Sequence, residues 1–206
     1  FQSIAGVGTS GQVLTSNGAG VLPTFQTAGA GASDWVKITS STASSSATIS
    51  FTGLSSTYIA YKVMISNLLP ATNAVEFFLR TSTNGGSTYD NAAGNYVFAL
   101  QGTAASTVGG RNTSATEIQL IDSTIFGTLA NTGNEESSWE ITLFNPSSAT
   151  EFKKVHWMGM NSPSTSCGFI TGTGARQSDT AVDAIQFLMS SGNISTGLFT
   201  LYGIKA

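Results

Sequence analysis

Charged residues are scarce in this chain. Only 9% of its 206 residues are Asp, Glu, Lys or Arg, against roughly 25% in an average soluble domain. The eight Lys and Arg residues are scattered singly, and the formal net charge is −3. Because phosphate binding needs a basic patch, nucleic acid is not expected as a partner. No run reaches the roughly 18 apolar residues of a membrane span, so membrane insertion is not expected either.

Cysteine and histidine occur once each. Cys167 has no second cysteine to pair with, which excludes a disulfide within the chain; it is expected to be a small buried residue at the start of a strand. A single histidine, His156, leaves too few ligands for a zinc site in one chain. Three copies of His156 on a trimer axis would be another way to bind a metal or an anion, but a partly exposed strand histidine is preferred. We expect no metal and no other cofactor.

Serine, threonine and glycine are abundant, so the polar character of the chain comes from uncharged residues. Threonine suits strands, whereas serine, asparagine and the 23 glycines suit turns. No stretch of ten residues shows helical periodicity. The sequence therefore predicts an all-β fold, and about ten short strands separated by polar loops indicate a β-sandwich or jelly-roll-like domain.

The end of the sequence carries the clearest strand pattern. Residues 182–190 and 198–205 both alternate with a period of two, and neither run has a clean polar face. This pattern predicts central strands that are covered on both sides. A chain whose last strand lies in the core cannot finish folding without that strand. Removal of the residues after Gly197 is therefore expected to prevent folding.

Further strands and loops follow from the same alternation. The residues 39–48, nearly all Ser, Thr and Ala, are expected to form a polar loop or a weak edge strand, and a turn is expected around Pro163. Strands are expected at residues 12–15, 23–26, 35–39, 47–51, 58–66, 75–82, 96–101, 117–125, 138–145, 152–160 and 168–171. In the strand at 152–160, Val155, Trp157 and Met160 are expected to point inward. Long polar loops are expected at residues 83–95, 102–116, 127–137 and 172–180.

The first 33 residues differ from the rest of the chain. Two short extended pieces flank the sequence Ser-Asn-Gly-Ala-Gly at residues 16–20, and Asn-Gly is a strong hairpin signal. So small a hairpin is not stable alone and needs neighbours, which copies from other chains can supply. We therefore expect an N-terminal hairpin segment at residues 1–26, a flexible linker at 27–33 and a β-sandwich head at 34–206.

Two segments resemble bacteriophage tail-fibre and related virion-appendage proteins. Residues 8–26, GTSGQVLTSNG…PTFQ, resemble a short module of trimeric fibre shafts, with Phe25 where tryptophan is frequent. Residues 191–205, SGN…FTLYGIK, resemble the close of such proteins. The resemblance implies an extracellular virion fibre, a homotrimer bound to other tail or capsid proteins, whose head follows a shaft. The apolar hairpin residues Val13, Leu14 and Phe25 are then expected at the trimer contact.

Catalysis finds little support in the sequence. Glu135 and Glu136 are the only adjacent acidic pair, but glycoside hydrolysis needs two carboxylates that face each other across a sugar. The pair is instead expected to be solvated loop charge. No Gly-x-Ser-x-Gly motif is present, and a lone histidine makes a catalytic triad improbable. We expect no enzymatic activity and no catalytic residue.

Binding is the function that the residues favour. Long loops on a rigid β scaffold commonly carry recognition. Sugar-binding sites combine an apolar or aromatic platform with a few placed polar groups. The residues expected to bind a host-surface glycan or protein are Tyr89, Asp90, Asn91, Asn95, Arg111, Asn112, Arg176 and Gln177.

Three interpretations remain open. The favoured one is a non-enzymatic homotrimeric fibre protein that attaches a virion to its host. The second is the same architecture as a capsid fibre or tail connector without receptor specificity. The third is a carbohydrate-binding or depolymerising domain of a secreted bacterial protein, against which the low charge and the lack of separated carboxylate pairs count. Trimerisation distinguishes the first two from the third, and cell or glycan binding distinguishes the first from the second.

Overall fold

The computed structural model describes residues 6–27, 35–103, 107–123, 127–161 and 168–205. Every regular element within these ranges is a β-strand, which confirms the all-β prediction. The chain divides into two compact units, Phe1–Asp34 and Trp35–Ala206. Residues 28–33 of the linker predicted at 27–33, the turn around Pro163 and Cys167 lie outside the described residues, whereas Thr27 ends a strand.

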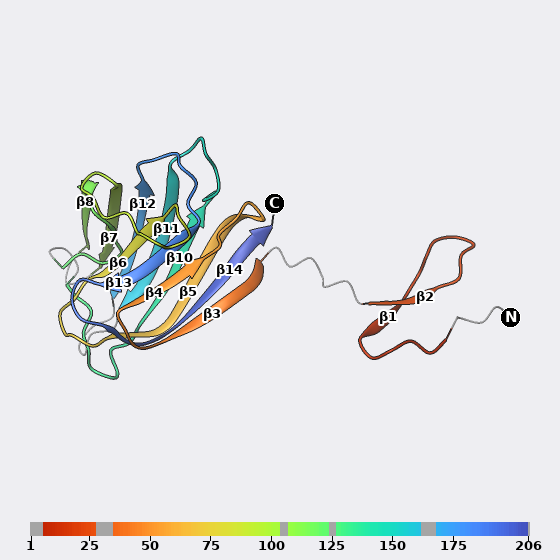
Figure 1. Cartoon of the computed structure of the whole chain (residues 1–206). Coiled ribbons are helices and arrows are strands. Elements are labelled where there is room, and N and C mark those ends of the chain that lie inside the picture. Colours follow the sequence, from red (N-terminus) through yellow and green to blue (C-terminus); the bar gives the residue numbers. More distant parts are fainter. Residues whose placement is uncertain (1–5, 28–34, 104–106, 124–126, 162–167, 206) are drawn as a thin grey trace. The chain divides into compact units, whose positions relative to one another are not determined.

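The second unit consists of two antiparallel sheets (Figure 1), consistent with the predicted β-sandwich. The larger sheet has the strand order β3 (Trp35–Ser46), β14 (Ile194–Lys205), β5 (Tyr58–Pro70), β10 (Ser137–Phe144), β11 (Lys153–Asn161), β12 (Gly168–Arg176), β7 (Tyr96–Thr103) and β8 (Thr107–Ala115). The smaller sheet has the order β4 (Thr48–Thr52), β13 (Ala184–Met189), β6 (Phe77–Ser82) and β9 (Ile118–Gln119).

Aromatic rings join the two sheets through the core. Phe199 of β14 lies 5.6 Å, centroid to centroid, from Phe187 of β13, and Phe187 lies 5.7 Å from Phe77 of β6. Phe77 in turn contacts Trp139 of β10 at 5.6 Å. All four side chains are buried. Aromatic pairs at such distances add about 0.5–1.5 kcal/mol each beyond their buried area, so this row of rings stabilises the packing of sheet on sheet.

The last two strands lie inside the two sheets, as predicted. β13 pairs with β4 and β6 in the smaller sheet, and β14 pairs with β3 and β5 in the larger one. The prediction that both faces of each strand are covered is wrong for β14. Its outward residue Leu198 is 44% exposed, because the outer face of the larger sheet faces solvent there.

Several predicted boundaries are wrong. The expected loop at residues 102–116 contains β8, and the expected loop at 172–180 begins within β12. The expected strand at 117–125 is reduced to the two residues of β9, and Met160 points outward and is exposed. The Gly- and Thr-rich segments lack apolar alternation, so their strand character comes from pairing with neighbouring strands. Residues 39–46 continue β3 along the sheet edge, which confirms the edge-strand alternative.

The first unit contains one strand pair, β1 (Gln12–Thr15) with β2 (Thr24–Thr27). The side-chain amide of Asn17 donates to the Leu22 carbonyl at 2.7 Å across the connection, and Gly18 adopts a φ of 102°, which glycine tolerates without strain. None of the described residues of this unit is buried. The pair therefore has backbone order but no hydrophobic core of its own.

Candidate functional site

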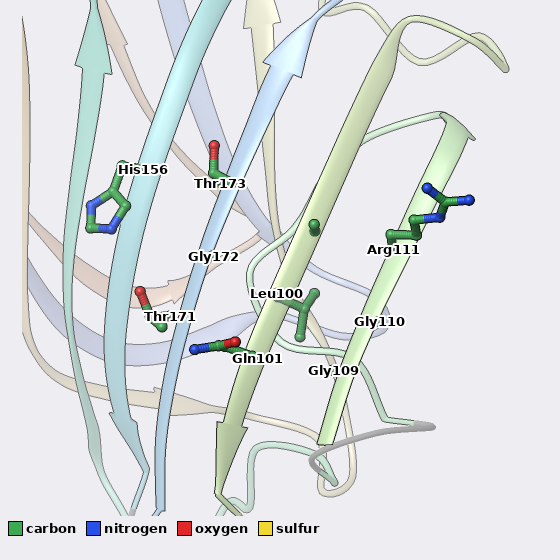
Figure 2. A pocket seen from close by; sticks show the side chains of 10 residues that line it. Leu100, Gln101, Gly109, Gly110, Arg111, His156, Thr171, Gly172 and Thr173 are labelled. Carbon is green, nitrogen blue, oxygen red and sulfur yellow. The ribbon is translucent and has the colours of Figure 1, made fainter. Parts of the chain in front are cut away.

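A shallow depression of about 640 Å³ lies on the outer face of the larger sheet (Figure 2). Four adjacent strands, β11, β12, β7 and β8, supply its walls and floor. Its volume falls within the roughly 300–1,000 Å³ of small-molecule sites. The lining residues are Ala99, Leu100, Gln101, Gly109, Gly110, Arg111, His156, Thr171, Gly172 and Thr173.

The pairing register places one row of the lining side by side. His156 pairs with Thr173, Thr173 with Ala99, and Ala99 with Arg111. Since neighbouring strands lie about 4.8 Å apart, His156 and Arg111 are separated by about 14 Å along this row. Figure 2 shows the two side chains on opposite sides of the depression. Ala99 between them presents only a methyl group, which leaves the middle of the row low.

A second row lies beside the first. Thr171 pairs with Gln101, and Gln101 with Gly109. Both Gln101 and Gly109 are exposed, and the Thr171 hydroxyl donates to the Trp157 carbonyl at 3.0 Å. The second row therefore adds the amide of Gln101 and the hydroxyl of Thr171 to the lining, and Gly109 contributes no side chain.

The inner face of the same strands holds the floor in place. Trp157 of β11 is fully buried, and its indole N–H donates to the Leu120 carbonyl at 3.0 Å. Its ring covers Gly172 of β12, where an added Cβ would lie 2.2 Å from Cζ2 of the tryptophan. Leu100 of β7 pairs with Gly172 on the other side. A tightly packed inner layer therefore fixes the backbone that carries the outward residues of the site.

The lining carries one permanent charge, and it is positive. Arg111 is exposed, and neither its side chain nor that of His156 makes a hydrogen bond or ion pair with any other described residue. Among the described residues, no carboxylate lines the depression. Glu140, on β10 of the same outer face, is paired with Lys62. The site therefore offers unused hydrogen-bond donors to a ligand.

Apolar side chains continue the outer face beside the depression. Met64 of β5, Met158 and Met160 of β11, and Phe169 of β12 are all about half exposed. Met158 pairs directly with Thr171 of the lining. Exposed apolar surface next to a polar depression is typical of an interaction face.

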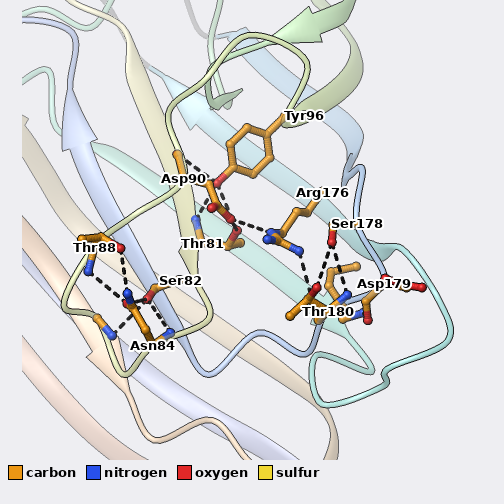
Figure 3. Close-up of polar contacts among 12 residues, drawn as sticks. Thr81, Ser82, Asn84, Thr88, Asp90, Tyr96, Arg176, Ser178, Asp179 and Thr180 are labelled. Carbon is orange, nitrogen blue, oxygen red and sulfur yellow. Dashed lines mark hydrogen bonds and ion pairs between the residues drawn. The ribbon is translucent and has the colours of Figure 1, made fainter.

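The residues predicted from loops separate into two groups. Asp90, Asn95, Arg176 and Gln177 come together. Arg176 Nε donates to Asp90 Oδ2 at 2.5 Å (Figure 3), and the Gln177 N–H donates to the Asn95 carbonyl at 2.8 Å. Arg176 ends β12 and is only 9% exposed, so its expected place in an exposed loop is wrong. Its guanidinium holds the loop that contains Asp90.

The other predicted residues have different surroundings. Tyr89 and Asn91 flank Asp90, and the Tyr89 hydroxyl lies against Gly86. Arg111 and Asn112 are in β8 rather than in the expected loop. Arg111 lines the depression, whereas the Asn112 side chain accepts from the Ser114 N–H at 2.8 Å. The binding roles of all eight residues stay predictions.

Sequence reasoning missed the polar residues that line the depression together with Arg111. Gln101, Thr171 and Thr173 gave no motif, and His156 was expected to be a partly exposed strand histidine rather than a ligand on a trimer axis. The usable signal was the position of these residues in the strand alternation, because each follows or precedes buried residues such as Leu100 and Trp157. This alternation places their side chains on the outer face of the sheet. Only the order of the strands brings them together in one depression.

One expectation about a charged residue is wrong, and one charged residue is unexpectedly buried. Glu135 is buried, so the expectation that it is solvated is wrong, whereas Glu136 is exposed. Lys153 is buried at the start of β11, and its ammonium donates to the carbonyls of Glu151 and Asp179. Burial, together with the nearby Arg176 charge, lowers the pKa of Lys153 below its ordinary value. These contacts hold the loops that contain Glu151 and Asp179.

Tyr96 is the buried centre of the Asp90–Arg176 network. Its hydroxyl accepts from the Thr81 N–H at 2.8 Å and donates to the Asp90 carbonyl at 3.2 Å (Figure 3). Burial, the largest cause, raises the pKa of Tyr96 to about 12 from an ordinary value of 10.0. The folded protein therefore holds this proton at pH values where the unfolded chain releases it.

Stability is expected to fall in alkali because of Tyr96. Its contribution is complete below pH 10.0 and is lost as the pH rises towards about 12, by about 3 kcal/mol over that window. Tyr96→Phe should be less stable at neutral pH by about 1 kcal/mol, because hydrogen bonds are lost, but should lack this alkaline slope. Urea unfolding at several pH values measures both effects, and parallel curves for the two proteins would disprove the assignment.

Comparison with known proteins assigns this chain to no family. Neither the protein-family models nor the curated proteins contain a match to this chain. Within the part of the chain that the structure describes, no three His, Cys, Asp or Glu side chains gather closely enough to hold a metal ion. Among the same residues, none belongs to a helix that could span a lipid bilayer.

Proposed function

We propose that the chain is a non-enzymatic, homotrimeric fibre protein of a bacteriophage virion that attaches the particle to its host. The resemblance of residues 8–26 and 191–205 to virion appendages supports the fibre assignment. The β-sandwich unit would contact the host surface, and the N-terminal unit would join the three chains and neighbouring tail or capsid proteins.

The observation that carries the proposal is the missing core of the N-terminal unit. Val13 is 48% exposed and Leu14 is 51% exposed, and Phe25 is only half-buried. An isolated two-stranded hairpin is marginally stable at best. Three copies that pack these side chains together would bury the apolar surface that one copy leaves in water, which supports the predicted trimer contact at these three residues.

The outer face of the larger sheet supports the attachment role. It carries the depression around Gln101 and Arg111 and, beside it, the exposed apolar residues Met158 and Phe169. Interfaces combine such apolar surface with a few polar groups. We therefore propose this sheet face, in addition to the predicted loops, as the surface that meets a host glycan or protein.

Leu14→Asp is expected to convert a trimer into a monomer. Three carboxylates buried in the shared contact would be unpaired, which costs several kcal/mol. Light scattering on the full chain gives the mass directly. Ile59→Asp, which places the same charge at an exposed residue of β5, should remain trimeric. A wild-type chain that is monomeric would overturn the fibre proposal and favour a secreted saccharide-binding module.

A further inference from the structure

We propose that the depression on β11, β12, β7 and β8 binds an anionic saccharide, with Arg111 as the group that recognises the negative charge. This inference rests on the proposed attachment function and names the class of ligand. The chain as a whole is acidic, with a net charge of −3, yet the depression has one charged side chain and that charge is positive. A site of this sign in such a protein selects against neutral and cationic ligands.

Arg111 is available for this role. Its guanidinium makes no hydrogen bond or ion pair with another described residue, whereas Arg80 and Arg176 are both engaged by carboxylates. A guanidinium offers several N–H donors in a planar arrangement that matches a carboxylate or a phosphate. The contact is strongest in the absence of competing acidic groups, and the residues that the structure describes place no carboxylate in the lining.

The remaining lining groups suit the neutral part of a sugar. Gln101 carries both donor and acceptor atoms, and the Thr173 hydroxyl and the His156 ring each offer both as well. The low floor at Ala99 and Gly109 admits a ring between them. The row from His156 to Arg111 is about 14 Å long. A row of this length is longer than one sugar ring, so it fits a short oligosaccharide rather than a single ion.

The test measures binding of trigalacturonic acid to the full chain by calorimetry or ligand-observed NMR at millimolar concentration. Its methyl ester is the neutral control, and a hexose phosphate tests whether phosphate can replace the carboxylate. We expect one or both of the anionic probes to bind, and the neutral ester to bind at least about tenfold more weakly. The binding should weaken as salt is added.

Arg111→Gln should weaken binding of the anionic probe at least about tenfold, because one charge-assisted hydrogen bond is lost. Lys154→Gln removes the same charge from an exposed residue of β11 outside the lining and should bind like the wild type. Equal binding of acid and ester, no binding of either anionic probe, or equal loss in both variants would overturn the inference.

Adsorption to host cells separates the two proposals. If the wild-type chain adsorbs to cells and Arg111→Gln adsorbs equally well, attachment stands and the anionic site is wrong. If the wild type binds the saccharide but adsorbs to no cell, the site stands and the attachment function is wrong. A parallel loss of saccharide binding and adsorption in Arg111→Gln supports both.

Discussion

Removal of the residues after Gly197 is expected to abolish folding of the β-sandwich unit. The deletion takes most of β14, including the buried side chains of Phe199 and Leu201. Full burial of one such side chain stabilises a fold by about 1.5–3 kcal/mol. Whole domains have a free energy of unfolding of only about 5–15 kcal/mol, so losing the burial of both side chains removes a large fraction of it.

The position of β14 makes the loss of stability larger than the lost apolar burial alone predicts. The strand pairs with β3 on one side and β5 on the other, so the deletion leaves β3 from Trp35 to Thr42 with no partner in the larger sheet. It also exposes the backbone groups of β5, and Phe187 loses the ring of Phe199. Unpaired backbone groups cost free energy in the interior and invite pairing with other chains outside it.

Circular dichroism and thermal unfolding of the truncated chain test this expectation. We expect no cooperative transition. Phe199→Ala should retain the fold but lose about 3–5 kcal/mol, whereas Leu198→Ala, on the exposed face of the same strand, should change stability by about 0.5 kcal/mol or less. A truncated chain that still melts cooperatively, or similar losses for the two alanine variants, would show that β14 is not a core strand.

The strands with large alternating apolar residues could be predicted from the sequence. Ile185, Phe187 and Met189 of β13 share a face because their spacing matches the strand period, and all three are buried. Phe199 and Leu201 of β14 follow the same rule. Local pattern decides these strands, since their own side chains supply the burial.

Strands β8 and β12 could not be predicted in the same way. Gly109 and Gly110 in β8 and Gly172 and Gly174 in β12 offer no apolar alternation of their own. The space inside β12 is filled from elsewhere, by Trp157 over Gly172 and by Ile118 beside Gly174. Whether a glycine belongs to a turn or lies under a neighbour's ring depends on strand register, which one sequence does not contain.

The candidate site illustrates the same limit. Arg111 was selected as a hydrogen-bond donor in a long loop with Asn112, but it lies in β8. Its row mates Thr173 and His156 lie far from it in the sequence, and the strand order brings all three to one depression. Conversely, Arg176 was expected to face a receptor and is instead engaged with Asp90. Composition identified the residue types, and topology decided their partners.

Gly172→Ala is expected to destabilise the protein by about 3 kcal/mol, at the upper end of overpacking changes. The new Cβ would lie 2.2 Å from Cζ2 and 2.5 Å from Cε2 of Trp157, far inside van der Waals contact. The indole cannot retreat without loss of its hydrogen bond to the Leu120 carbonyl, because Trp157 is fully buried. The melting temperature should fall by about 6–12 °C.

Two further variants isolate the steric cause of this loss. Gly133→Ala is the matched control, because no atom lies within 4 Å of its added Cβ and its φ is not in the left-handed region; its stability should be nearly unchanged. Trp157→Phe removes part of the ring that the new methyl group meets. In the double variant the two losses should therefore sum to less than their separate values, with a coupling of about 0.5–3 kcal/mol. Additive losses would mean that the ring over Gly172 is not what excludes a side chain there, and that the floor of the depression is less tightly packed than the register of β11 and β12 implies.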